Sequence, residues 1–496
     1  MIRVGILAGL LVPQVLCAAS EFDNLAKDVP PGANVILLID VEKTLATEMA
    51  KTNGWASPEK VATRPAYLPP EADKVVVASQ VDPPNGFKQS WESAVVGLKE
   101  SLPMRLIAKA EGGYVDAING KECAWVPSDA YFVQINENTL GLLHPANKQA
   151  ASRWIDEQKS SRTGVSSYLQ SAIDEVATGP QIVLALDAKD ALSAHQLHQR
   201  FSESKVVAQA KLDVDSMVGL FSSLRGITLG ITISDNAQAR AEIEFGQTIT
   251  FDAAVGKAFV LAALTNLQAE IPGVDAWTYS IRENSIIAEG ELPLPGLRRI
   301  LSTLEIPTTK FSSLKGEDTE SEGSAEDILT KSLTYFKSIS GLIKDLERQS
   351  KSSSGDNYWF DRYAKRIDRL PILHVDPDLL DFGQKTSETL RVMSGARKSA
   401  NLSTGVAKAN IGASTDNDEG SNGYVGYGRN GYRGGYRRSG YASVSGRASA
   451  QQRSINAADR RFQATATTKK IEGFRLIDEA TYELRRTMTE RYNSEF

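Results

Sequence analysis

The sequence predicts an α+β protein with two tandem repeated α+β units that have mainly antiparallel sheets, followed by an α-helical C-terminal region with a disordered insert. Three observations support this fold class. Two pairs of similar segments recur at a nearly constant spacing, which indicates an internal repeat. Alternating apolar residues on either side of Asn-containing turns indicate antiparallel hairpins. Apolar residues three and four positions apart recur after residue 327, as they do in packed helices.

The composition is that of a globular chain with an uneven distribution of charge. The 496 residues are 41% hydrophobic and 24% charged, and they are enough for two or three domains. Residues 351–496 contain 24 Lys and Arg and 17 Asp and Glu, a net charge of +7. Because the whole chain carries −5, residues 1–350 carry −12. An acidic body with a basic tail indicates a tail that contacts an anionic partner or the body itself.

Residues 1–19 have the pattern of a secretory signal peptide. Arg3 precedes an apolar run, Val4–Leu16, and small residues follow up to position 20. The run is shorter than the roughly 20 apolar residues that span a bilayer. We therefore expect cleavage between positions 16 and 21 and an extracytoplasmic protein, periplasmic or secreted. An uncleaved membrane anchor and a buried N-terminal helix are the alternatives.

The repeat rests on two matches in the same order along the chain. Val35–Lys43 is echoed 147 residues later by Ile182–Asp190, and both are buried-type strands that end at an Asp. Ile135–Leu140 is echoed 146 residues later by Ile281–Ile286, in each case as two strand ends around a turn. We therefore expect one α+β unit over residues 20–160 and a second over residues 178–308. An apolar helix near 255–267 is too short to span a membrane.

Asp40 and Asp187 occupy matching positions at the ends of the two repeated strands. Paired carboxylates can perform general acid–base chemistry if the two units face each other. Alternatively, each Asp accepts hydrogen bonds from the first backbone N–H groups of the helix that follows its strand. We favour capping and assign no catalytic residue.

No metal, cofactor or reactive thiol is expected. His195 and His198 share one face of a predicted helix, but a metal site needs further ligands at suitable spacing, which we do not find. Residues 416–427 depart from the calcium-loop pattern at the glycine and at the twelfth position. After removal of the signal peptide, Cys123 is the remaining cysteine, and its alternating surroundings predict a buried thiol in a strand.

The last third of the chain is expected to be helical. Residues 309–327 form an acidic linker, a helical region covers 328–404, and a C-terminal helix covers 449–496. Two apolar stripes mark the helix faces, and the second has coiled-coil spacing, so self-association through tail helices is an open alternative. The stripes are Ile328, Tyr335, Ile339, Leu342 and Leu346, and then Phe474, Ile477, Thr481, Leu484 and Met488.

Between these helices, residues 405–448 are rich in Gly, Tyr and Arg and are predicted to be disordered. No acidic residue occurs between Gly420 and Ala458, so the segment is positively charged. Arginine binds phosphate, sulfate and carboxylate groups, and tyrosine stacks on rings. The candidate polyanion contacts are Arg429, Arg433, Arg437, Arg438, Tyr432 and Tyr436. For an exported chain the expected partners are anionic envelope polysaccharide or lipid headgroups, and no nucleic acid; a solvated spacer is the alternative.

A resemblance to other proteins rests on this layout and on two motifs in the helical region, Tyr358–Asp361 and Arg369–Asp376. The chain resembles uncharacterised bacterial extracytoplasmic proteins that have a duplicated α+β body and a Gly/Tyr-rich helical tail. The resemblance implies the fold and the export, and it transfers no function.

The function that these patterns favour is binding or scaffolding, without catalysis, by an exported protein of the cell envelope. Its ligand is not specified by any motif. Two other classes stay open: an extracytoplasmic hydrolase with a site between the duplicated units, and an oligomeric structural protein assembled through its tail.

Overall fold

A computed structural model describes residues 21–304, 325–395 and 444–496, apart from gaps at 58–64, 66–67, 70, 84–86, 159–163, 268, 351–356, 371 and 373. The predicted signal peptide and residues 405–443 of the predicted Gly/Tyr/Arg insert lie outside the described residues, whereas residues 444–448 of that insert are helical, because α15 begins at Val444. The chain divides into two compact units. The sheet unit comprises residues 1–263 and 271–319, and the helical unit comprises residues 264–270 and 320–496.

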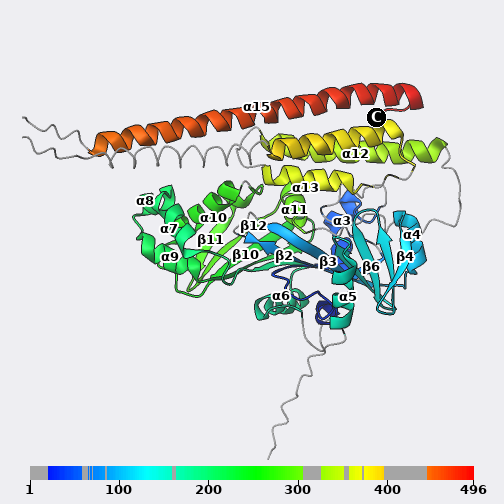
Figure 1. Cartoon of the computed structure of the whole chain (residues 1–496), viewed down its shortest axis with the longest axis horizontal. Coiled ribbons are helices and arrows are strands. Elements are labelled where there is room, and N and C mark those ends of the chain that lie inside the picture. The colour runs from blue at the N-terminus through cyan, green and yellow to red at the C-terminus, as the bar shows by residue number, and fades with distance from the viewer. Residues whose placement is uncertain are drawn as a thin grey trace, which may run out of the picture. The chain divides into compact units, whose positions relative to one another are not determined.

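All the strands of the sheet unit belong to one antiparallel sheet of 12 strands (Figure 1). The spatial order is β11-β12-β10-β9-β8-β1-β2-β3-β7-β6-β5-β4, so β11 and β4 are its edges. The strands are β1 (Val35–Asp40), β2 (Ala72–Asp82), β3 (Lys88–Leu98), β4 (Tyr114–Ile118), β5 (Lys121–Val126), β6 (Ala130–Asn136), β7 (Thr139–His144), β8 (Ile182–Asp187), β9 (Leu224–Ile233), β10 (Ala237–Phe245), β11 (Thr278–Arg282) and β12 (Ser285–Glu291).

Helices separate the strands in a regular order. In the first half of the unit they are α1 (Glu21–Ala26), α2 (Val41–Leu45), α3 (Glu48–Asn53), α4 (Met104–Glu111) and α5 (Lys148–Glu157). In the second half they are α6 (Ser167–Thr178), α7 (Ala194–Ser202), α8 (Lys205–Ala210), α9 (Val214–Ser222), α10 (Ala253–Leu267), a 3-10 turn η3 (Val274–Ala276) and α11 (Leu294–Leu301).

The two halves join through β1 and β8, which pair antiparallel. At the centre of this pairing Leu37 lies opposite Leu184, its counterpart in the predicted repeat. The sequence suggested separate sheets for the two units, and on this point the structure differs, because one sheet runs through both. The reason is that every residue of β1 is buried, so the strand needs a hydrogen-bonded neighbour on each side.

The order of the strands corresponds between the two halves. From the centre outward, β1-β2-β3-β7-β6 in the first half corresponds to β8-β9-β10-β12-β11 in the second. The first half alone continues, through the β4–β5 hairpin. In the matching place of the second half, between β10 and β11, the chain forms the longer helix α10.

Side chains at matching positions also make the same contacts. The Asn34 amide bonds both the backbone N and O of Val81, at 2.8 and 2.9 Å. The Gln181 amide, at the matching position of the second half, bonds the backbone N and O of Ile233, both at 2.9 Å. Each amide therefore takes the place of one backbone residue before its own strand, and it pairs with the end of the neighbouring strand.

The faces of the sheet are covered differently in the two halves. On one face, a core of buried residues from β1, β2, β6, β7 and β8 is covered by α1, α5 and α6. On the opposite face, the second half packs β10, β11 and β12 against α7, α8, α9 and α10 through an aromatic cluster. The members of that cluster are Phe201, Phe221, Phe245, Phe251 and Phe259.

Asp40 and Asp187 differ in their local roles. The Asp40 carboxylate accepts a hydrogen bond from Lys43 N at 3.0 Å and caps α2, as expected. The expectation for Asp187 was wrong. Its carboxylate bonds Lys189 N, two residues on, and closes a turn, because α7 begins only at Ala194.

The helical unit contains α12 (Ala325–Ser350), α13 (Asn357–Asp368), a helix over residues 377–395, and α15 (Val444–Tyr492). The predicted stripe on α12 is buried at Tyr335, Ile339, Leu342 and Leu346. On α15, the predicted seam is buried at Phe474, Ile477 and Met488. Among the described residues, no helix is both long and apolar enough to cross a membrane.

A buried carboxylate fixes the end of α15 within the helical unit. Asp376 accepts hydrogen bonds from Arg491 and from the Tyr492 hydroxyl, both at 2.7 Å. Burial acts to raise the pKa of Asp376, but these two hydrogen bonds outweigh it and hold the pKa below its usual range. The Arg369–Asp376 motif of the sequence thus ends in a structural anchor.

Candidate functional site

A row of neighbouring side chains runs across β4, β5, β6, β7 and β3 in the first half of the sheet, and all of them but Ser93 are large. Tyr114 on β4 pairs with Trp125 on β5, which pairs with Tyr131 on β6. Tyr131 in turn pairs with Leu143 on β7, which pairs with Ser93 on β3. The Tyr114 and Trp125 rings stack with centroids 5.3 Å apart. Residues directly opposite on antiparallel strands share a face, so the row is continuous.

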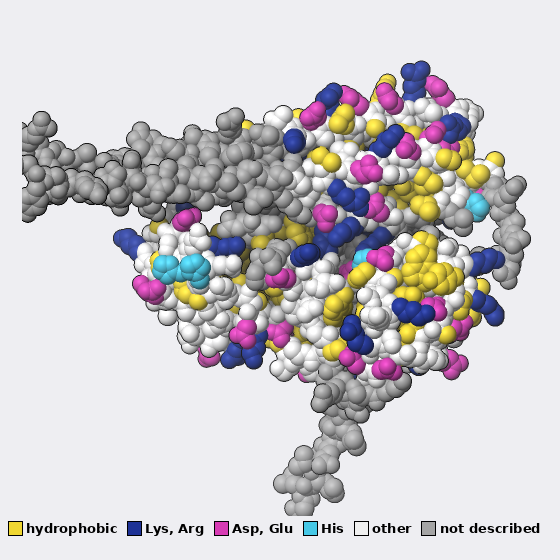
Figure 2. Space-filling model, in the orientation of Figure 1, with side chains coloured by type: hydrophobic (Ala, Val, Ile, Leu, Met, Phe, Trp, Pro, Cys, Tyr) yellow, Lys and Arg dark blue, Asp and Glu magenta, His cyan; other side chains and the backbone are white. Residues whose placement is uncertain are grey.

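The row runs from buried to exposed toward the sheet edge. Leu143 and Tyr131 are buried, Trp125 is partly buried, and Tyr114 at the edge is 55% exposed. Trp91, two residues before Ser93 and on the same face, is also partly buried. Figure 2 shows hydrophobic side chains gathered on the surface over β4, β6 and α4.

Helix α5 lies against this face of the sheet. The Asn147 side chain caps it by accepting a hydrogen bond from Ala150 N at 3.0 Å. Trp154 is buried against Gly141 of β7, where a Cβ atom would lie only 2.4 Å from the indole. The Trp154 indole N–H donates to the backbone O of Asp28 at 2.6 Å. The helix is therefore held rigidly at its N-terminus and at its centre.

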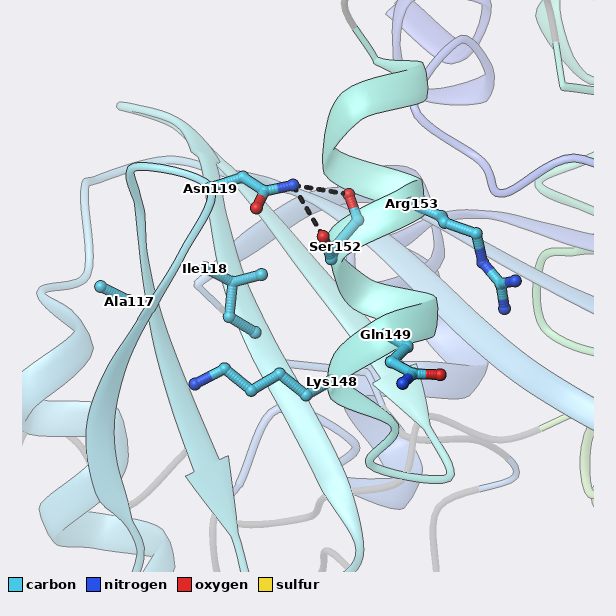
Figure 3. Close-up of a pocket in the computed structure, with 7 residues that line it drawn as sticks. All are labelled: Ala117, Ile118, Asn119, Lys148, Gln149, Ser152 and Arg153. Atoms are coloured by element: carbon cyan, nitrogen blue, oxygen red, sulfur yellow. Dashed lines mark hydrogen bonds between the residues drawn. The ribbon is translucent and has the colours of Figure 1, made fainter.

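A first hollow, with a volume of about 540 Å³, lies between α5 and the β4–β5 turn (Figure 3). Its lining is polar on the helix side: the Asn119 amide donates to the Ser152 hydroxyl at 2.8 Å and to its backbone O at 3.0 Å. The lining residues are Ala117, Ile118, Asn119, Lys148, Gln149, Ser152 and Arg153.

Lys148 and Asp116 form an ion pair at the entrance to the first hollow. The Lys148 ammonium lies 2.7 Å from one Asp116 oxygen and 3.0 Å from the other. This hydrogen bond lowers the pKa of Asp116 and raises the pKa of Lys148, so both groups are charged at neutral pH. Figure 3 shows Lys148 directed from α5 toward the strands, whereas Gln149 and Arg153 extend from the other side of the helix.

A second hollow, of about 290 Å³, lies on that other side of α5. Its walls combine two tryptophans and three prolines with a rim of polar and charged side chains. The lining residues are Pro30, Pro31, Ser90, Trp91, Leu143, Pro145, Asn147, Ala150, Arg153, Trp154 and Glu157. Arg153 lines both hollows and is exposed. Within the described part of the chain, neither a hydrogen bond nor an ion pair engages its guanidinium.

Taken together, the two hollows offer aromatic faces, hydrogen-bond donors and acceptors, and a guanidinium that is free to bind an anion. Concave surfaces that combine apolar walls with a few polar groups are typical of ligand sites. Trp91 and Trp125 carry no motif in the sequence, and their shared face depends on strand register. The turn Asn119-Gly120 is the one local signal that a hairpin forms here.

The residues considered from the sequence are not brought together in this place. Asp40 and Asp187 lie at opposite ends of the β1–β8 pair, since the Asp40 N–H bonds Gln181 O and the Asp187 N–H bonds Asn34 O. Clustering of these two carboxylates in one cleft would favour the hydrolase alternative, and the structure separates them. The six polyanion candidates, Arg429, Arg433, Arg437, Arg438, Tyr432 and Tyr436, lie outside the described residues.

His195 and His198 are exposed on α7, and His198 lies 3.7 Å from Asp215. Among the described residues, no group of three or more His, Cys, Asp or Glu side chains is placed to hold a metal ion. Cys123 is fully buried in β5, as its alternating surroundings predict. Burial raises the pKa of its thiol to about 11, which keeps it protonated at neutral pH.

The chain was compared with known proteins in three ways. No family model matches it, and no curated protein sequence gives a significant match. Among solved structures, crystal form III of TP0453 is 12% identical, with a TM-score of 0.34, over 56% of this chain and 98% of that chain. Crystal form I of TP0453 is 13% identical, with a TM-score of 0.33, over 57% of this chain and 98% of that chain. The similarity to TP0453 is distant and structural.

Proposed function

We propose that this chain is an exported binding protein of the cell envelope that acts without catalysis and holds its ligand in the two hollows beside α5. The observation that carries the proposal is the pair of hollows beside α5, both lined by Arg153, of which the second is also lined by Trp91, Trp154 and Leu143 of the aromatic row. Such a surface can bind and orient a ligand through ring stacking and hydrogen bonds.

We also propose that the sheet unit arose by tandem duplication and that the first copy acquired the ligand site. Support comes from the shared strand order, the pairing of Leu37 with Leu184, and the matching amides of Asn34 and Gln181. The β4–β5 hairpin is the addition peculiar to the first half, and its turn lines the first hollow.

Export and the basic insert complete the proposal. The N-terminal pattern of residues 1–19 supports export, and the mass of the mature N-terminus tests it. We propose that Arg429, Arg433, Arg437 and Arg438, with Tyr432 and Tyr436 between them, add a salt-sensitive contact to anionic envelope polysaccharide or lipid headgroups. Replacing the four arginines with glutamine should remove the retention that these residues add on acidic polysaccharide at low salt; unchanged retention and salt dependence would leave the insert as a spacer.

The proposed function is tested by sedimentation of the full chain with insoluble polysaccharide prepared from bacterial envelopes. Gln149 is exposed and lines the first hollow, so Gln149→Trp should obstruct the site and lower the affinity at least tenfold. Gln196→Trp is the matched control, because Gln196 is also exposed on a helix but lies on α7. Equal sedimentation of both variants with wild type, or none by wild type, would contradict the proposal.

A further inference from the structure

We propose that the second hollow binds one ring of an acidic saccharide, with the sugar ring stacked on Trp91 and its carboxylate held by Arg153. This inference rests on the proposed function, and it names the class of ligand for the same site. It is carried by the combination of a partly exposed tryptophan, rigid walls and a guanidinium without a partner among the described residues.

The wall beside the stacking surface is held in place before any ligand arrives. Trp154, beside Trp91 in the lining, is fixed by its bond to Asp28 O and by its contact with Gly141. Proline side chains at Pro30, Pro31 and Pro145 form the other apolar walls and have little conformational freedom to lose. A site whose walls are already ordered avoids much of the entropic cost of binding.

The chemistry of the walls fits a sugar ring. An aromatic face is negative, and the C–H bonds on the flat side of a sugar ring are polarised positive by the neighbouring oxygen atoms, so the two attract. The volume of about 290 Å³ is at the lower end of the size range of small-molecule sites. This is room for a single ring rather than for a whole oligosaccharide, so the rest of a chain would continue along the surface.

Hydroxyl groups of the ring would find partners on the rim. The Asn147 side-chain oxygen is occupied by Ala150 N, which leaves its NH2 group to donate. Ser90 is exposed beside Trp91 and can donate or accept. A polar ligand can thus be oriented as well as stacked.

Arg153 selects for a negative charge. Arg153 is the one cation among the described residues that line the second hollow, whereas Lys148 lines the first hollow and is paired with Asp116, at 2.7 Å. The guanidinium of Arg153 presents a planar set of donors that matches a carboxylate in two-point contact. A uronic acid supplies both features at once, because its carboxylate is attached directly to the sugar ring.

The test is isothermal titration of the full chain with two probes that differ in the carboxylate alone, trigalacturonate and galactotriose. Wild type should bind trigalacturonate at least tenfold more tightly than galactotriose, because a hydrogen bond to a charged group contributes more than a neutral one. Arg153→Gln should lower the affinity for trigalacturonate about tenfold and leave galactotriose unchanged. Trp91→Ala should weaken both probes at least tenfold.

Two further variants keep the test decisive. Arg105→Gln is the matched control, since Arg105 is an exposed arginine on α4 that lines neither hollow. If Trp91→Ala fails to fold, Arg153→Gln decides alone, because an exposed side chain can be exchanged with little effect on folding. Equal binding of both probes, or wild-type affinity in Arg153→Gln, would overturn the inference. If envelope polysaccharide still binds wild type and not Gln149→Trp while trigalacturonate fails, the acidic-sugar inference falls and the proposed function stands.

Discussion

The two halves of the sheet unit share a framework and differ in the side chains that they place on it. In the first half, one row of facing residues is Tyr131, Leu143 and Ser93. Helix α5 lies against this face, and aromatic residues continue the row toward the sheet edge. In the second half, the matching row reads Thr278, Glu289 and Arg240.

The second row is polar and open to solvent. Arg240 forms ion pairs with Glu289 and with Glu242, and these side chains are between one third and one half exposed. The comparison indicates that strand order and register tolerate opposite surface chemistry, as is expected when function resides in side chains placed on a common fold. The proposed ligand site accordingly lies where the side chains of the two halves differ.

The largest effect is expected when a residue of the second half is transferred to the first. Gly141 of β7 corresponds to Ile287 of β12, and Gly141→Ile would drive a side chain into Trp154 and Ile135. Overpacking of this kind should lower the free energy of unfolding by about 3 kcal/mol. Urea denaturation of the full chain measures it, with Ile287→Val, expected to cost about 1 kcal/mol, as the comparison. A cost below about 1 kcal/mol for Gly141→Ile would mean that α5 does not press on β7.

The matching amides test whether the halves are equivalent in energy as well as in geometry. Asn34→Ala and Gln181→Ala should each cost about 2 kcal/mol, because each leaves a backbone N–H and a backbone O without a partner. The two losses should agree within about 0.5 kcal/mol. Gln196→Ala, at an exposed position, serves as control. A loss in one half alone would break the correspondence.

The two strand-end aspartates, unlike the matching amides, should contribute unequally to the free energy of unfolding. Asp40→Ala removes a helix cap and an ion pair with Lys43, at 3.1 Å, and should cost about 1 kcal/mol. Asp187→Ala removes one hydrogen bond of a turn and should cost about 0.5 kcal/mol. Thermal unfolding of both variants gives the order, and a larger loss for Asp187→Ala would contradict these assignments.

The smallest effect concerns Asp28 and Glu175, which again occupy matching positions in the two halves. Burial raises the pKa of each carboxyl above its ordinary value, and the nearby cations Lys121 and Arg240 offset this in part. A pKa that is raised on folding means that the folded chain binds protons more readily. At neutral pH the charged form of each group therefore lowers the free energy of unfolding. This loss disappears as the pH falls through the folded pKa values.

Removing these charges has a defined sign. Asp28→Asn and Glu175→Gln should each stabilise the chain slightly at pH 7, because both groups are partly exposed and solvent screens the effect, and the gain should shrink toward pH 4. Urea unfolding at the two pH values is the measurement. A loss of stability at pH 7 in either variant would show that its carboxylate makes a favourable contact in the folded chain.

Much of the fold was predictable because it depends on patterns that are local in sequence. The similar segments at Val35–Lys43 and Ile182–Asp190 each contain a strand, as predicted, and the helical stripe of α12 is buried as expected. The joining of both halves into one sheet was missed, because the pairing of β1 with β8 connects segments that are far apart along the chain. The prediction that Asp187 caps a helix was wrong. The next helix, α7, begins only at Ala194, so the Asp187 carboxylate closes a turn instead.

The candidate site was not predictable from the sequence for a related reason. Trp91, Trp125 and Arg153 are far apart along the chain and belong to no motif. Strand register and the position of α5 bring them to one face. A single residue slip in either strand would turn the aromatic side chain to the other face. The basic insert was noticed because composition is visible without a fold.

The most direct test of the central claim is hydrogen–deuterium exchange of the full chain with and without envelope polysaccharide. If the site belongs to the first half, ligand should slow exchange in residues 113–126 and 145–157, which form the hairpin and α5 with its entry. Residues 278–301, the matching strands and helix of the second half, should exchange at the same rate in both samples. Protection of residues 278–301, or bound polysaccharide without protection at 145–157, would contradict the account.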